Sequence, residues 1–170
     1  MVTGQQKQLI KQVGEYLVAA ELCRRELIAT SFTGNVPVFD IIAITNDEKM
    51  KTIQVKTTTT NSGWNLEGTK FLDFEHPVDN KQHIKGFRIL SYSDTIFCFV
   101  ILRSFGKEMT LSEHDEFYLV PVKELQAIVR SAYERHLKKM NFVRKNDSHH
   151  VKLKPSDISR FKNNWDCLLK

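Results

Sequence analysis

Four polar side chains in the first third of the chain, Glu15, Asp40, Gln54 and Lys56, are suited to metal-assisted hydrolysis. Asp40 lies early in an apolar run at residues 38–44, and Gln54 and Lys56 stand two residues apart in the next apolar run. A charged group inside such a run costs free energy unless it is paired or bound to a metal. A carboxylate and an amide oxygen can hold a hard cation such as Mg²⁺, and a lysine can orient a water and neutralise developing charge.

A helix over residues 5–28 is expected to position the first of these side chains, because apolar residues recur there at spacings of three and four. Val18 and Leu22 follow Glu15 at three and seven, so Glu15 begins a second apolar stripe on a helix buried on two sides. Gly14 beside it allows another backbone to approach closely. Two interpretations of Glu15 stay open: it points into the site, or it only favours the helix dipole.

Two strands, at residues 38–44 and 50–57, are predicted to position the other three side chains. In an antiparallel hairpin, Asp40 faces Gln54 and Lys56 only if the numbers of paired residues sum to an even value. The turn must then hold an odd number of residues, or a bulge must correct the register. The amine of Lys56 is expected to reach Asp40 across this hairpin. The alternative is that these are separate structural residues on half-exposed strands.

This order, a helix with Glu, a strand with Asp, a turn and a strand with Gln-x-Lys, resembles the PD-(D/E)xK nuclease superfamily. That group contains restriction enzymes, Holliday-junction resolvases and some homing endonucleases. Residues 14–22 and 117–121 also look like small bacterial members of the group. The sequence departs from the pattern twice, because Phe39 rather than proline precedes Asp40, and because Gln54 stands in place of the second acid.

The resemblance implies a restriction-endonuclease-like three-layer α/β sandwich with a central mixed sheet, and a DNA endonuclease that uses Mg²⁺, with Mn²⁺ as a substitute. Asp40, the Gln54 amide oxygen and the backbone carbonyl of Val55 would hold the metal. Lys56 would position the attacking water, and Glu15 would bind a second ion or a water. A neutral Gln54 predicts weaker metal affinity than a glutamate. The alternative is a non-catalytic nuclease-fold module for DNA binding or assembly.

Thr57 and Thr58 begin a threonine-rich run at the lysine end of the second strand. Their hydroxyls and backbone N–H groups are candidates to hold phosphate oxygens of DNA. The plainer interpretation, which stays open, is the tail of a strand that runs into a loop.

The whole chain of 170 residues is predicted to form a single domain. Its core is expected at residues 5–60 and 94–140, with residues 64–93 as a candidate insertion and a last helix at 156–169. No glycine-rich phosphate loop is present among the seven glycines, so no small-molecule cofactor is expected.

Composition narrows the partners and the compartment. The net charge of +5 is compatible with DNA, although many ordinary proteins are as basic. Three cysteines without a CxxC spacing favour a reducing compartment, and we expect a cytoplasmic protein. The longest apolar run, residues 96–102, is far shorter than the roughly 20 residues that a membrane span needs. Cutting both strands of a duplex calls for two active sites, so we expect a homodimer, with contacts from residues 64–93 or an exposed helix.

Overall fold

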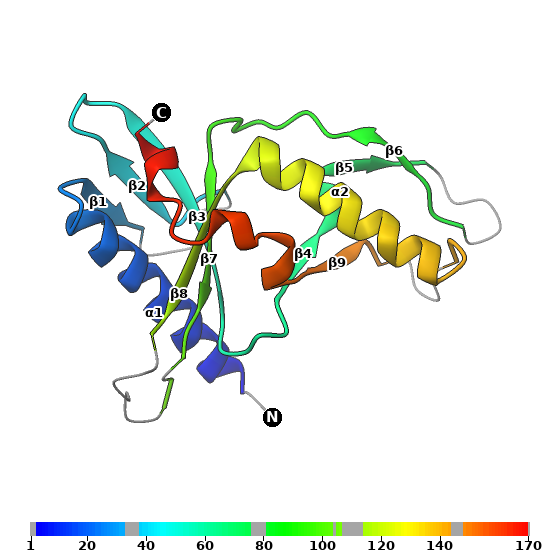
Figure 1. The fold of residues 1–170 in the computed structure, drawn as a ribbon, viewed down its shortest axis with the longest axis horizontal. Helices are drawn as coiled ribbons and strands as arrows, with labels where there is room; N and C mark the ends of the chain where they lie inside the picture. Colours follow the sequence, from blue (N-terminus) through cyan, green and yellow to red (C-terminus); the bar gives the residue numbers. More distant parts are fainter. Residues whose placement is uncertain are drawn as a thin grey trace.

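The computed structural model describes a mixed α/β protein built on a five-stranded sheet in the order β1-β2-β3-β7-β8 (Figure 1). The described residues are 3–32, 38–75, 81–103, 105–106, 114–143 and 148–169. The strands of this sheet are β1 Ile28–Ser31, β2 Ile41–Ile44, β3 Met50–Thr58, β7 Ile96–Ile101 and β8 Glu116–Pro121. The β3 and β7 strands run parallel, and the other neighbours run antiparallel.

Two α-helices cover opposite faces of the sheet. Successive side chains of a strand point to opposite faces, so neighbouring residues of one strand pack against different helices. The helix α1, Gly4–Cys23, packs in one hydrophobic cluster with residues such as Cys98 and Leu119. The helix α2, Val122–Lys139, packs in a second cluster with their strand neighbours Phe99 and Val120. Figure 1 shows α1 beside β1–β3 and α2 beyond β7 and β8. Among the described residues, no helix is long and apolar enough to cross a membrane.

The β2–β3 hairpin has the register that the sequence predicts. Ile41 pairs with Ile53 and Ile44 with Met50, so paired numbers sum to an even value, and the turn at 45–49 has an odd number of residues. Strand β2 begins at Ile41, three residues later than predicted. Beyond Ile41 the Val55 N–H donates to the Asp40 carboxylate instead of to the backbone of the neighbouring strand.

The first helix ends five residues before its predicted end at residue 28. It begins with a capping box in which Thr3 and Gln6 bond each other's backbone N–H groups. After Cys23 the chain turns through Glu26, which has a φ of 64°, and the Leu27 N–H donates to the Leu22 carbonyl. This left-handed residue ends the helix and places Leu27 in the core.

Residues 64–93, the predicted insertion, contribute to the second hydrophobic cluster. They form strand β4 Trp64–Glu67, the 3₁₀ helix η1 Gly68–Lys70, and strands β5 Leu72–Phe74 and β6 Ile84–Phe87. The β5 and β6 strands pair with each other, whereas β4 pairs with β9, His150–Leu153. Trp64, Phe71 and Leu72 are buried in the cluster, so this segment is part of the folded core.

The predicted last helix at 156–169 is wrong in type, although its apolar residues are buried. The segment forms three one-turn 3₁₀ helices: η2 Pro155–Asp157, η3 Ser159–Phe161 and η4 Trp165–Leu168. The Asn163 N–H donates to the Phe117 carbonyl, and Lys162 forms a bridge with Tyr118, so β8 draws this backbone out of a helical path. Asn163 has a φ of 55°, which an α-helix does not allow.

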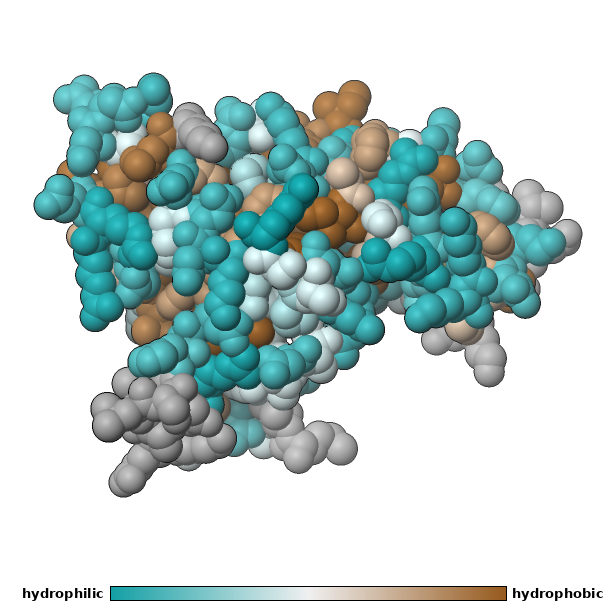
Figure 2. Space-filling model, in the orientation of Figure 1, coloured by the Kyte–Doolittle hydropathy of each residue, from teal (hydrophilic) through white to brown (hydrophobic). Residues whose placement is uncertain are grey.

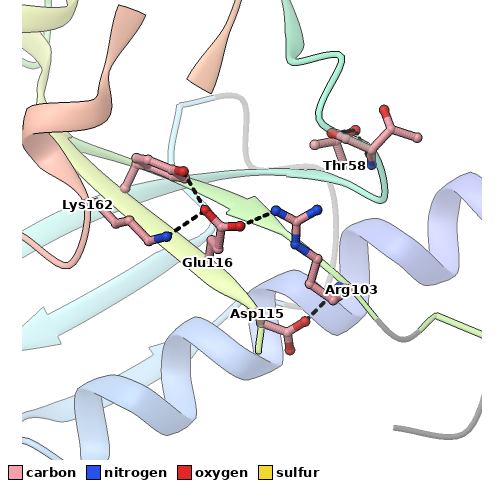
Figure 3. Close-up of polar contacts among 7 residues, drawn as sticks. Thr58, Arg103, Asp115, Glu116 and Lys162 are labelled. Atoms are coloured by element: carbon pink, nitrogen blue, oxygen red, sulfur yellow. Dashed lines mark hydrogen bonds and ion pairs between the residues drawn. The ribbon is translucent and has the colours of Figure 1, made fainter. Parts of the chain in front are cut away.

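Side chains fasten the same segment to β8. Figure 3 shows Lys162 and Arg103 converging on Glu116, whose carboxylate accepts a hydrogen bond 2.8 Å long from Lys162 and another from Arg103. The Tyr118 hydroxyl donates to the same carboxylate over 2.6 Å.

Candidate active site

The structure brings Glu15 of α1, Asp40 before β2 and Gln54 of β3 together where the β2–β3 ladder ends. Asp40 is 8% exposed. Its Oδ2 accepts hydrogen bonds from the Val55 N–H, over 2.8 Å, and from the Gln54 side-chain amide. Asp40 therefore has a structural role, because it satisfies a backbone N–H that strand β2 no longer reaches.

Close packing of α1 on β3 brings Glu15 to this position. A Cβ added to Gly14 would lie 1.8 Å from the Thr57 Oγ1 and 2.9 Å from its Cβ. The close backbone approach expected at Gly14 is therefore present. It places Glu15 on the side of the helix that faces Asp40.

Lys11 provides a cation between the two acids. Its Nζ lies 3.1 Å from the Glu15 Oε1 and 3.5 Å from the Asp40 Oδ1. Lys56 was expected to contact Asp40, but the structure places Lys11 there, and among the described residues Lys56 forms no ion pair. The sequence analysis missed Lys11, although its spacing of four from Glu15 is that of a helical ion pair.

Burial shifts the protonation equilibria of the site. Burial raises the pKa of Glu15, and the nearby Asp40 charge raises it further, whereas Lys11 lowers it. Burial also lowers the pKa of Lys56, with the charges of Lys70 and Lys11 adding to the effect and Asp40 opposing it. The lowered pKa of Lys56 increases the fraction of its neutral amine, the form that can accept a proton from water.

The two threonines predicted to bind phosphate lie on opposite faces of β3, because side chains alternate along a strand. Thr57 packs against Gly14, on the face of β3 opposite to Gln54 and Lys56. Thr58 contacts the Thr60 backbone through its hydroxyl. The Thr57 Oγ1 is buried without a hydrogen-bond partner among the described residues, and the phosphate contact of either threonine stays a prediction.

The donor set fits a hard divalent cation. The Glu15 Oε1 is buried without hydrogen-bond geometry to any described residue, although Lys11 lies close enough for an ion pair. The Lys11 ammonium thus occupies a position between the Glu15 and Asp40 carboxylates, where another cation could also contact both. Among the described residues, the Gln54 Oε1 makes no hydrogen bond. The Val55 carbonyl faces the same side of β3 as its N–H, toward Asp40. In the described part of the chain, no three His, Cys, Asp or Glu side chains are placed so that they could hold a metal ion together, so an amide oxygen would have to complete the set.

A cavity of about 610 Å³ opens beside Gln54 and Lys56. Leu66, Phe71 and Phe97 supply apolar wall, and cationic and exposed residues border the rest: Lys70, Arg88, Ile89, Tyr92 and His150. The cavity therefore reaches Gln54 and Lys56, whereas Glu15 and Asp40 are not among its described lining residues.

Comparisons with known proteins address the fold. No protein-family model matches the sequence, and no curated protein matches it. Among solved structures, the bacterial homing endonuclease I-Ssp6803I is similar over 95% of this chain and 92% of that chain, with a TM-score of 0.53 and 11% sequence identity. The fold of the chain is therefore similar to that of this endonuclease. This confirms the fold class predicted from the sequence, an α/β protein with a central mixed sheet flanked by helices.

Proposed function

We propose that the protein is a Mg²⁺-dependent DNA endonuclease that hydrolyses phosphodiester bonds, with a PD-(D/E)xK-type site in which Gln54 replaces the second acid. The observation that carries the proposal is a pair of acids, the half-buried Glu15 and the buried Asp40, that share the Lys11 ammonium near Lys56. The nuclease-like fold supports it.

Each residue has a defined part in this proposal. Asp40, the Gln54 amide oxygen and the Val55 carbonyl hold the metal, and Glu15 binds a second ion or a water. Bound there, Mg²⁺ or Mn²⁺ supplies electrostatic stabilisation of the charge that develops on the phosphate oxygens. Lys56 orients the attacking water and offers a second positive charge to the same oxygens.

The deciding experiment is plasmid cleavage by the wild type and by Asp40→Asn, with Mg²⁺ and with Mn²⁺. Asparagine keeps an oxygen for the Val55 N–H, so the fold is expected to survive while the charge that holds the metal is lost. Cleavage should fall by orders of magnitude, and the increase in melting temperature with Mn²⁺ should disappear. Asp47→Asn, on the exposed turn of the hairpin, is the matched control. Equal cleavage by wild type and Asp40→Asn would disprove the catalytic proposal.

A second candidate function is a non-catalytic DNA-binding or assembly module. The hydrogen bond from the Val55 N–H to Asp40 and the Lys11 ion pairs favour it, because they give the acids a structural use without metal. Lys56→Ala distinguishes the two functions: the enzyme retains Mn²⁺ binding and loses cleavage, whereas the module binds DNA with no effect of metal in either form.

The proposal includes a homodimer, since one site per chain cuts one strand and two symmetry-related sites cut both. Light scattering at tens of micromolar tests this part. A monomer at that concentration would favour a nicking activity instead.

A further inference from the structure

The cavity beside Lys56 is larger than the hydrolytic residues require. At about 610 Å³ it falls within the range of sites that take small organic ligands. Leu66 and Phe71 are buried beneath it, and Phe97 is half-buried, packed against Phe71 with ring centroids 5.6 Å apart. Part of the wall is therefore apolar and aromatic, a surface suited to a nucleobase as well as to water.

The charge along the cavity favours an anion. Lys56, Lys70 and Arg88 all border it, whereas Glu67 is the single carboxylate among the described lining residues. Glu67 already accepts a hydrogen bond from Thr69. Lys70 is exposed and forms no ion pair with any described residue, so its charge is available to a ligand such as a phosphate.

The segment between β6 and β7 gives the cavity an apolar rim. Ile89 is 93% exposed, and Tyr92 is 49% exposed. Tyr92 also lies edge-on to Phe39, the residue before Asp40, with centroids 6.4 Å apart. Figure 2 shows apolar surface along the upper edge, where Figure 1 draws this segment. The rim thus combines an exposed aliphatic side chain with an aromatic ring that packs against Phe39.

We propose that this cavity holds the DNA strand next to the scissile phosphate, with Lys70 on a neighbouring phosphate and Ile89 wedged against the bases. The proposal rests on the proposed function and adds the residues that grip and distort the substrate. Apolar side chains that enter between base steps unstack them, and duplexes that are already weakly stacked cost less to open. Ile89 is therefore expected to favour duplexes that contain a mismatch.

Fluorescence anisotropy in EDTA, with perfect and single-mismatch duplexes of matched composition, tests both contacts without cleavage. The wild type should bind the mismatched duplex severalfold more tightly. Lys70→Gln should weaken binding to both duplexes alike and reduce the slope of log affinity against log salt by about one. Ile89→Ser should retain affinity for the perfect duplex and lose the preference for the mismatch. Lys139→Gln, at the exposed end of α2, is the control for an unrelated cation.

The outcomes separate this inference from the nuclease proposal. If Lys70→Gln or Ile89→Ser binds both duplexes as the wild type does, the inference fails, and the plasmid assay with Asp40→Asn still decides the catalytic function. If the wild type binds no DNA in EDTA or with Ca²⁺, the inference and the nuclease proposal both fail. Lys70 and Ile89 are exposed, so unchanged thermal melts are expected for both variants.

Discussion

At the scale of single residues, the cation at the site is part of the chain. The Lys11 ammonium contacts both Glu15 and Asp40, and its stem is half exposed, so the side chain is free to swing into solvent. Under the proposed function, a divalent ion that enters the site would have to displace Lys11. Metal affinity would then reflect this competition as well as the lack of charge on Gln54.

Lys11→Met is expected to strengthen Mn²⁺ binding by about tenfold, the equivalent of 1.4 kcal/mol. Methionine keeps the packing of the stem and removes the competing charge. Melting temperature titrated against Mn²⁺ measures the change. Lys7→Met, one turn earlier on the exposed surface of α1, should leave the titration unchanged. Weaker Mn²⁺ binding by Lys11→Met would contradict the competition.

Gln54→Glu is expected to have opposite effects with and without metal. The added carboxylate should strengthen Mn²⁺ binding, because it adds one negative charge to the donor set. Without metal, it should destabilise the fold by about 1–3 kcal/mol, because Asp40 loses an amide donor and gains a like charge. Urea denaturation with EDTA and with Mn²⁺ measures both effects. A variant that is more stable than the wild type in EDTA would contradict this account of Gln54.

At the scale of elements, the contact between α1 and β3 sets the distance between Glu15 and Asp40. Gly14→Ala should destabilise the protein by about 1–3 kcal/mol through overpacking, offset by a helix-propensity gain of about 1 kcal/mol. The overpacking should dominate, because the added Cβ meets the Thr57 Cβ, which no side-chain rotation can move. Urea denaturation measures the change. Gly4→Ala, with no atom within 4 Å of the added Cβ, should be neutral or stabilising.

The attachment of the C-terminal segment to β8 predicts an acid-sensitive contact. Burial by itself would raise the pKa of Glu116, but hydrogen bonds from Lys162, Tyr118 and Arg103 lower it to about 2 (Figure 3). The folded pKa lies below the ordinary value of 4.5, so the contact stabilises the fold above about pH 4.5, and this stability is lost as the pH falls toward 2.

Glu116→Gln should therefore lower the urea midpoint at pH 7 and make its decline between pH 5 and about pH 3 shallower. Glu124→Gln, which removes an exposed ion pair with Arg160, should keep the wild-type pH profile. Parallel acid profiles for wild type and Glu116→Gln would show that Glu116 does not contribute.

The sequence pattern predicted the β2–β3 hairpin, whose register depends on residues close together in the chain. The parity of the β2–β3 register followed from the spacing of Asp40 and Gln54, because alternation leaves two choices of face. The end of α1 at Cys23 and the broken C-terminal helix did not follow from the sequence. In both places the chain is redirected by a residue with positive φ, Glu26 or Asn163, and neither is a glycine that marks such a turn.

At the scale of the whole molecule, the sequence predicted the fold class, and the structure brings three of the candidate residues, Glu15, Asp40 and Gln54, close together. The sequence did not predict how the second half of the chain completes the fold. The pairing of β4 with β9 joins segments that no local signal connects. The predicted insertion at 64–93 was for the same reason hard to interpret, since its partners lie far along the chain. The cavity, which depends on this segment and on His150, could not be inferred from the motif.

That β4–β9 pairing also has a consequence for the order of folding. Trp64 pairs with Leu153, and about half of the chain lies between them, so this contact closes a long loop at a high entropic cost. The β1–β2–β3 meander with α1 needs no such closure and should form early. Stopped-flow refolding should accordingly show a late phase in the fluorescence of Trp64, absent from a Trp64→Phe variant. Glu15 and Asp40 would then come together before the residues that line the cavity are in place. A partly folded chain would therefore have the candidate catalytic groups but not the surface proposed to bind DNA.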